Sequence, residues 1–237
     1  MAIQAGETTF YQAKRGIVQD GLVLNLDAAV DASYSGGTTW RDLVGGNDVS
    51  MANSPLFEKY NGGGFNFDGS NNYGDFGSFN ITGGNNYTIC IWLKTSSNIA
   101  GQNVIDHSAG ASGFGVRMSD TAPRQFYHFV YDSATSDPAA VTLNTETILA
   151  DTIYHFTLVI KTGNMISYVN GGSKTTGTST SNNIKASSSN MLLGAPVGGS
   201  YGGPWAGNFY SVGIYNRVLA DDEVLQNYNA TRHRFGV

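Results

Sequence analysis

The chain has 237 residues, a length that suits one large all-β domain and does not require a second core. Only 13% of the residues are charged, while 31 glycines and many Asn, Ser and Thr supply turns and a neutral polar surface. The net charge of −5 excludes the basic footprint that nucleic acid or an anionic membrane would require. We therefore expect many strands joined by many loops.

The expected elements begin with an N-terminal arm, residues 1–16, followed by a β-sandwich domain over residues 17–237. The first clear strand covers residues 17–27, where leucine recurs at every second position in its latter half. The strongest strand pattern covers residues 87–94, which have one apolar face. The remaining strands are expected at 64–68, 73–76, 103–106, 114–118, 124–131, 154–161, 165–169, 191–193 and 209–215.

The last third of the chain adds a loop and a helix. Residues 171–189 are almost all Gly, Ser, Thr and Asn, so we expect a loop there. One helix is expected from about 221 to 232, with three acidic residues at its N-terminal end. Strands at roughly ten-residue intervals without helical crossovers predict an antiparallel β-sandwich, a jelly roll, with one short C-terminal helix. The predicted core contains Leu24, Phe67, Ile89, Ile91, Trp92, Phe156, Leu158, Leu193 and Ile214.

Several classes of feature are missing from the sequence. Cys90 is the sole cysteine, so no intrachain disulfide is expected, and its apolar surroundings favour a buried thiol over a nucleophile. No basic segment followed by an apolar run opens the sequence, and no apolar run is long enough for a membrane span. We expect a protein made in a host cytoplasm without a signal peptide and released by lysis.

A series of short motifs follows in a fixed order along the chain. They are IVQDGLVLNLD at 17–27, TWRDL at 39–43, FDGSNNY at 67–73, YHFTLV at 154–159, YVNG at 168–171 and IYNRVL at 214–219. The series resembles the laminin-G-like branch of the concanavalin A-like lectin/glucanase superfamily over residues 17–232. The resemblance implies a concanavalin A-like sandwich. The opening segment, together with QNYNA at 226–230, is similar to versions encoded in tailed-bacteriophage genomes.

Catalysis is not expected. The retaining glucanases of this fold need two carboxylates about 5 Å apart. The chain has only four glutamates, and no two of them share a predicted strand. Its four histidines are scattered and lack the spacing of a zinc site. We therefore expect no catalytic residues, no required cofactor and no enzyme activity.

Calcium is the metal that the resemblance implies, because related laminin-G domains often bind it at the sandwich rim. Residues 68–75 are rich in oxygen ligands, and Asp68 and Asp75 are the candidate metal ligands. Asp27 and Asp42 are also candidates for positions near a rim. The alternative interpretation is that these residues form ordinary turns rich in Asp and Asn.

Glycan binding would use an exposed aromatic side chain flanked by Asn and Asp. Trp205, Tyr201 and Tyr34 lie in Gly-rich stretches and are the candidates. Trp205 directly precedes a predicted strand, so the alternative for this residue is a plug at the end of the sandwich.

The resemblance implies a non-enzymatic virion surface protein of a tailed bacteriophage, either a head-decoration or a fibre-like subunit, with capacity for glycan adhesion. Its partners would be other virion proteins and host-surface polysaccharide, in a multi-copy assembly. Ile3, Phe10 and Tyr11 in the arm are the candidate attachment residues, unless the arm packs on its own sandwich as an edge strand. The alternative function is a glycan-binding adhesin module for attachment to a host or cell surface.

Overall fold

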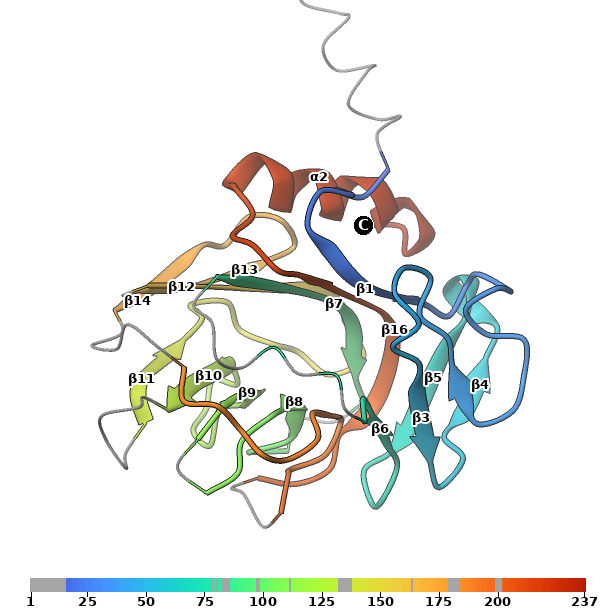
Figure 1. The fold of residues 1–237 in the computed structure, drawn as a ribbon, viewed down its shortest axis with the longest axis horizontal. Coiled ribbons are helices and arrows are strands. Elements are labelled where there is room, and N and C mark those ends of the chain that lie inside the picture. The colour runs from blue at the N-terminus through green and yellow to red at the C-terminus, as the bar shows by residue number, and fades with distance from the viewer. Residues whose placement is uncertain are drawn as a thin grey trace, which may run out of the picture.

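The computed structural model describes residues 16–77, 79, 81, 86–96, 99–110, 112–131, 138–162, 164–178, 184–198 and 202–237. Two antiparallel sheets face each other, and helix α2 (Asp221–Thr231) lies across the outer face of one of them (Figure 1). The predicted all-β sandwich with one short C-terminal helix is therefore confirmed. Of the predicted arm, only Gly16 belongs to the described residues, so Ile3, Phe10 and Tyr11 lie outside them.

We call the sheet beneath α2 the helix-covered sheet. Its longest strand, β16, pairs with β7 on one side and, on the other, with β5 through its first half and β1 through its second half. The strands run in the order β14 (Thr175–Thr178), β13 (Asn164–Val169), β12 (Ile153–Lys161), β7 (Tyr87–Thr95), β16 (Ala206–Tyr215), β5 (Gly64–Asp68) and β4 (Leu56–Glu58), with β1 (Leu22–Asp27) beside β16.

The second sheet closes the sandwich from the opposite side. Its order is β11 (Pro138–Leu143), β10 (Phe126–Tyr131), β9 (Phe114–Met118), β8 (Asn103–Asp106), β15 (Leu192–Leu193), β6 (Tyr73–Asp75), β3 (Val49–Ala52) and β2 (Thr39–Trp40). Two short 3₁₀ turns, η1 (Tyr60–Gly62) and η2 (Arg232–Arg234), complete the elements. Within the described ranges, no helix is long and apolar enough to cross a membrane.

The core lies between the sheets and contains every residue predicted for it except Trp92, which is buried on the outer face of the helix-covered sheet. In β1 the alternation of side chains places Leu24 and Leu26 inside the sandwich, while Asn25 and Asp27 point to the outer face. This outward pair is the first component of the candidate site.

Trp92 is buried on the outer face of the helix-covered sheet, beneath the C-terminal segment. Its indole nitrogen Nε1 donates a hydrogen bond to Thr231 Oγ1 at 2.8 Å. The rings of Tyr228 and Phe235 pack against the Trp92 ring, with centroids 5.7 and 4.3 Å away. Helix α2 is thus held to the sheet by an aromatic cluster, which leaves a pocket beside it.

Several strands were not expected. Residues 175–178, predicted as part of a loop, form β14 because they pair with β13. The short strands β2, β3, β4 and β11 also lie outside the predicted set. Each of them is defined by pairing with a neighbour rather than by a long apolar pattern, and such pairing is not visible in a local sequence window.

Candidate functional site

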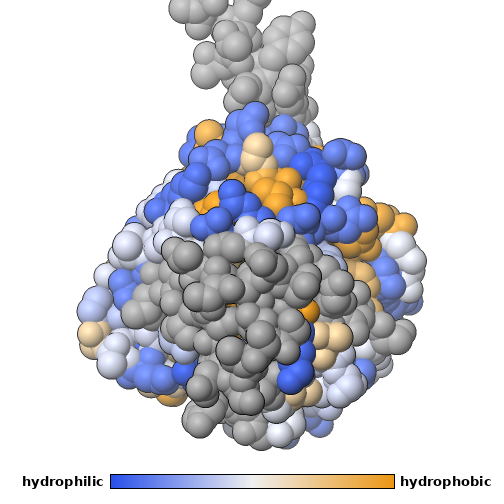
Figure 2. Space-filling model, turned by 60° about the vertical axis from the view of Figure 1, so that its left-hand side comes forward, coloured by the Kyte–Doolittle hydropathy of each residue, from blue (hydrophilic) through white to orange (hydrophobic). Residues whose placement is uncertain are grey.

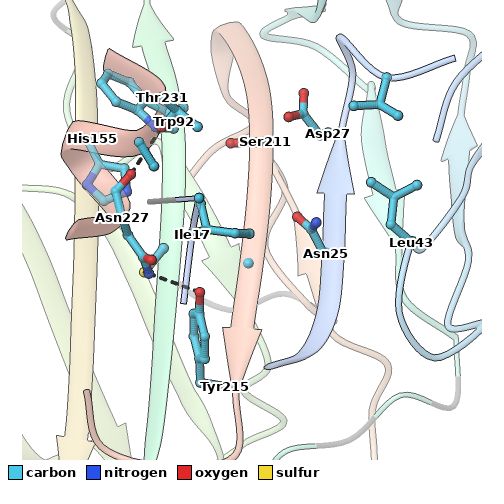
Figure 3. A pocket seen from close by; sticks show the side chains of 15 residues that line it. Ile17, Asn25, Asp27, Leu43, Trp92, His155, Ser211, Tyr215, Asn227 and Thr231 are labelled. Carbon is cyan, nitrogen blue, oxygen red and sulfur yellow. Dashed lines mark hydrogen bonds between the residues drawn. The ribbon is translucent and has the colours of Figure 1, made fainter. Parts of the chain in front are cut away.

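A pocket of about 260 Å³ lies between the outer face of the helix-covered sheet, helix α2 and the segment that begins at Gly16. Strands β1, β16, β7 and β12 form its floor, and Asn227, Ala230 and Thr231 of α2 form one wall (Figure 3). Ile17, Val30 and Leu43 add apolar side chains to its lining, and Val30 and Leu43 are partly exposed at its mouth. The pocket thus joins polar and apolar side chains from segments far apart in the sequence.

One row of side chains crosses four neighbouring strands of the floor. Asp27 of β1 is the cross-strand partner of Ser211 in β16. Ser211 is in turn the partner of Trp92 in β7, and Trp92 is the partner of His155 in β12. The row therefore runs from an acidic group through a hydroxyl to two buried rings.

A parallel row, one step along the strands, opens space in the floor. Asn25 is paired with Gly213, and Gly213 is paired with Cys90. A Cβ atom added to Gly213 would meet nothing closer than 3.9 Å. The missing side chain at Gly213 therefore leaves a hollow between Asn25 and the aromatic cluster.

Two polar side chains in the floor are free to bind a ligand. Among the described residues, the side-chain amide of Asn25 and the Ser211 hydroxyl have no hydrogen-bond partner, and both residues are only half-buried. The Asp27 carboxylate is held by Arg234, whose Nη1 lies 3.0 Å from each oxygen, and Oδ1 also accepts the Ala29 amide. Asp27 Oδ2 keeps further acceptor capacity.

The wall of the pocket is rigidly bonded. Asn227 of α2 donates from Nδ2 to the Tyr215 hydroxyl at 3.0 Å, and its Oδ1 accepts the Val18 amide at 2.8 Å. These two bonds tie the helix, strand β16 and the N-terminal segment together. The wall of the cavity is therefore held by hydrogen bonds to two other segments.

The loop at the mouth is ordered by Asp42. Its carboxylate accepts the backbone amides of Asn25, Gly45, Val44 and Asn47. Partial burial alone would raise the pKa of Asp42, but these four bonds outweigh it and the pKa is lowered. The apolar side chain of Leu43 is thereby fixed beside β1 (Figure 3).

The arrangement does not form a hydrolytic triad. Ser211 and His155 stand two strands apart with Trp92 between them, a separation of roughly 9 to 10 Å. Burial lowers the pKa of His155 to about 3, and its Nδ1 has no partner among the described residues. The site can therefore hold a polar ligand, but among the described residues no histidine lies within reach of the Ser211 hydroxyl to complete a triad.

The candidate calcium ligands lie on different sheets, Asp68 in β5 and Asp75 in β6. Asp68 Oδ1 accepts the amides of Ser70, Asn71 and Asn72, and the bond from Ser70 is the main reason why its pKa is lowered. Asp75 accepts bonds from the Gly77 amide and the Asn190 side chain. In the part of the chain that the structure describes, no group of three or more His, Cys, Asp or Glu side chains is placed to hold a metal ion.

The three aromatic residues predicted for sugar binding lie in different environments. Trp205 is fully buried and packs against Phe209 at 5.6 Å, so the structure agrees with the alternative of a plug in the sandwich and not with an exposed sugar platform. Tyr34 is half-buried against Phe57 and Phe65, and its hydroxyl donates to the Gly37 carbonyl. Tyr201 lies outside the described residues. Asn25, Ser211 and Gly213 were not among the site residues predicted from the sequence.

Comparison with known proteins places the chain in a family. The model of the concanavalin A-like lectin/glucanases superfamily matches residues 68–225. No curated protein matches the chain significantly.

Solved structures share the fold at low sequence identity. The binding domain of Paraclostridial Mosquitocidal Protein 1 is 12% identical with a TM-score of 0.70, and the match covers 89% of this chain and 52% of that one. The botulinum neurotoxin serotype D binding domain is 13% identical with a TM-score of 0.65, and the match covers 88% of this chain and 51% of that one. Trypanosoma rangeli sialidase in complex with sialic acid is 17% identical with a TM-score of 0.63, and the match covers 93% of this chain and 34% of that one. The chain therefore spans between about one third and one half of these proteins.

Proposed function

We propose that this chain, which belongs to the concanavalin A-like lectin/glucanase superfamily, is a non-enzymatic carbohydrate-binding module. The pocket beside α2 carries the proposal. It is concave, it has free hydrogen-bonding groups at Asn25 and Ser211, and aliphatic side chains line its mouth. Sugars present the same combination of hydroxyl groups and apolar C–H surface.

The similar structures support an adhesive role. Two of them are binding domains of toxins, and a third is a sialidase in complex with sialic acid. On this chain, an apolar patch enclosed by hydrophilic residues lies at the level of α2 (Figure 2). A module of this kind would attach its carrier to a glycan-covered surface.

Two observations support the absence of catalysis. The three described glutamates are engaged in structural contacts: Glu58 accepts bonds from Asn66 and Asn208, Glu146 accepts one from Ser173, and Glu223 pairs with Arg217. Ser211 has no histidine within reach. We expect no release of reducing sugar from laminarin or agarose. Turnover that is lost when a single Asp is changed to Asn would refute this part of the proposal.

A glycan array probed with the full chain tests the binding function. The proposal predicts retention on a limited set of glycans, with competition by the corresponding free sugar. Signals no stronger than those of an unrelated β-sandwich of similar charge, on every glycan, would rule the function out.

The display of this module on a bacteriophage particle is a separate proposal about its carrier. It is supported by the resemblance of the opening and closing segments to phage-encoded versions. Protein inventories of purified particles test it: the chain should be found in multiple copies beside the capsid or tail proteins. Its presence in cell fractions alone would contradict the proposal.

A further inference from the structure

The pocket beside α2 has a distinctive charge. Asp27 is the only carboxylate among the described residues that line it, and these residues include no Lys or Arg. Arg234 binds both Asp27 oxygens through Nη1, and its Nε and Nη2, which have no partner among the described residues, are buried and do not line the pocket. An acidic sugar would bring a second carboxylate next to Asp27 without a free cation to receive it, and burying such a group is costly. The pocket therefore selects against acidic sugars.

The polar floor suits the hydroxyl groups of a neutral sugar. The side-chain amide of Asn25 can both donate and accept, the Ser211 hydroxyl can do the same, and Asp27 Oδ2 can accept. Because Asp27 and Ser211 are cross-strand partners, their side chains lie side by side on one face of the sheet. Two adjacent hydroxyls of one ring can therefore be bonded at the same time.

The mouth of the pocket is apolar. Val30 is 38% exposed and Leu43 is 37% exposed, so both present aliphatic surface to solvent at the opening. The backbone amide of Leu43 donates to the Asn25 carbonyl, and the Asp42 bonds order its loop. In Figure 3 the Leu43 side chain lies across the β1 ribbon from the Asn25 side chain. A ligand group that combines a methyl with an amide would satisfy both Leu43 and the free Asn25 side chain.

We infer that the pocket takes a single neutral sugar ring that carries an N-acetyl group, such as a terminal N-acetylhexosamine. Its acetamido methyl packs on Leu43 and Val30, its amide meets Asn25, and its ring hydroxyls meet Ser211 and Asp27. A cavity of about 260 Å³ limits the bound part to one ring. The inference rests on the proposed function and specifies its ligand class and site.

Titration of the full chain with four free sugars tests the ligand class. The probes are N-acetylglucosamine, N-acetylgalactosamine, glucose and N-acetylneuraminic acid, with dissociation constants from NMR shifts. We expect at least one N-acetylhexosamine to bind roughly fourfold more tightly than glucose, the gain that burial of one methyl group gives. It should also bind more tightly than N-acetylneuraminic acid, which has the acetamido group but adds a carboxylate. Tighter binding of glucose or of the acidic sugar would overturn the ligand class.

Glycine substitutions test the site. Gly213→Val fills the hollow in the floor without a backbone clash and should weaken N-acetylhexosamine binding by about tenfold or more. Gly172→Val is the matched control, because its added Cβ also meets nothing closer than 4.0 Å and lies outside the pocket. Ser211→Ala, which leaves the backbone unchanged, should weaken binding in the same direction.

The outcomes separate the inference from the proposed function. If a glycan binds and Gly213→Val leaves its affinity unchanged while retaining the wild-type melting temperature, the site is wrong and the module is still a lectin. If no sugar binds in titration and no glycan is retained on the array, the proposed function fails as well.

Discussion

Asp27 and Ser211 stand directly opposite each other across the pairing of β1 and β16, although 184 positions separate them in the sequence. Both side chains point to the outer face of the sheet, away from the core leucines of β1. A carboxylate and a hydroxyl are thus placed side by side where helix α2 leaves the sheet uncovered. This pair is the polar centre of the proposed sugar pocket.

Trp92 should be the main anchor of helix α2. Trp92→Ala removes a fully packed ring from between the sheet and the C-terminal segment, so the free energy of unfolding should fall by about 3 to 5 kcal/mol. Thr231→Val removes the hydroxyl that accepts the indole bond and donates to the Asn227 carbonyl, and it should cost about 1 kcal/mol. Urea denaturation measures both. A loss below about 1 kcal/mol in Trp92→Ala would mean that the helix is not held by this ring.

Buried histidines should make the protein sensitive to mild acid. Burial lowers the pKa of His128 to about 4, and neither ring nitrogen of His128 has a partner among the described residues. The unfolded chain takes up a proton near pH 6.5, while the folded chain does so only near pH 4. The stability gained from neutral His128 is therefore present above pH 6.5 and is lost as the pH falls towards 4.

The variant His128→Leu isolates this effect. Between pH 6.5 and 4, the stability of the variant should decline less steeply than that of the wild type, by up to about 3 kcal/mol over the interval. His233→Leu, at an exposed position, serves as the control. Denaturant titrations at several pH values measure the difference. Identical pH profiles for the wild type and His128→Leu would show that His128 is not buried in its neutral form.

The loop at the pocket mouth should depend on Asp42. Asp42→Ala leaves the amides of Val44, Gly45 and Asn47 without their acceptor, which should cost about 1 to 3 kcal/mol and speed amide hydrogen exchange in this loop. Asp42→Asn keeps one acceptor oxygen and should show a smaller effect. Exchange measured residue by residue distinguishes this local loosening from global destabilisation. Unchanged protection of these amides in Asp42→Ala would show that they do not depend on hydrogen bonds to the Asp42 carboxylate.

Asp68 should act as a turn residue. Its Oδ1 already accepts three backbone amides, so we expect the melting temperature to be the same in calcium and in EDTA. If EDTA instead lowers the melting temperature and Asp68→Asn abolishes that sensitivity, calcium occupies this turn.

Local patterns in the sequence predict the inward and outward faces of single strands but not which strands become neighbours. The alternation in residues 22–27 already separates Asn25 and Asp27 from Leu24 and Leu26. The partner Ser211 depends on a long-range register between β1 and β16, and a local window does not contain that register. For this reason one half of the pocket was visible in the sequence and the other half was not.

For Trp205, the composition of the surrounding sequence suggests an exposure that the structure does not show. Its Gly-rich surroundings favour an exposed loop, and this led to its choice as a sugar platform. The backbone of Trp205 is instead bonded to two distant glycines, by its amide to the Gly194 carbonyl and by its carbonyl to the Gly69 amide. These bonds draw the ring into the core against Phe209. Composition alone cannot distinguish a flexible loop from a bonded one.

Chemical-shift mapping of the backbone amides, during titration with a glycan retained on the array, tests the central claim most directly. If the pocket beside α2 is the carbohydrate site, the largest shifts will fall on Asn25, Asp27, Ser211 and Gly213, with smaller ones on Leu43. Shifts concentrated on the second sheet or around Tyr34, with β1 and β16 unaffected, would contradict it.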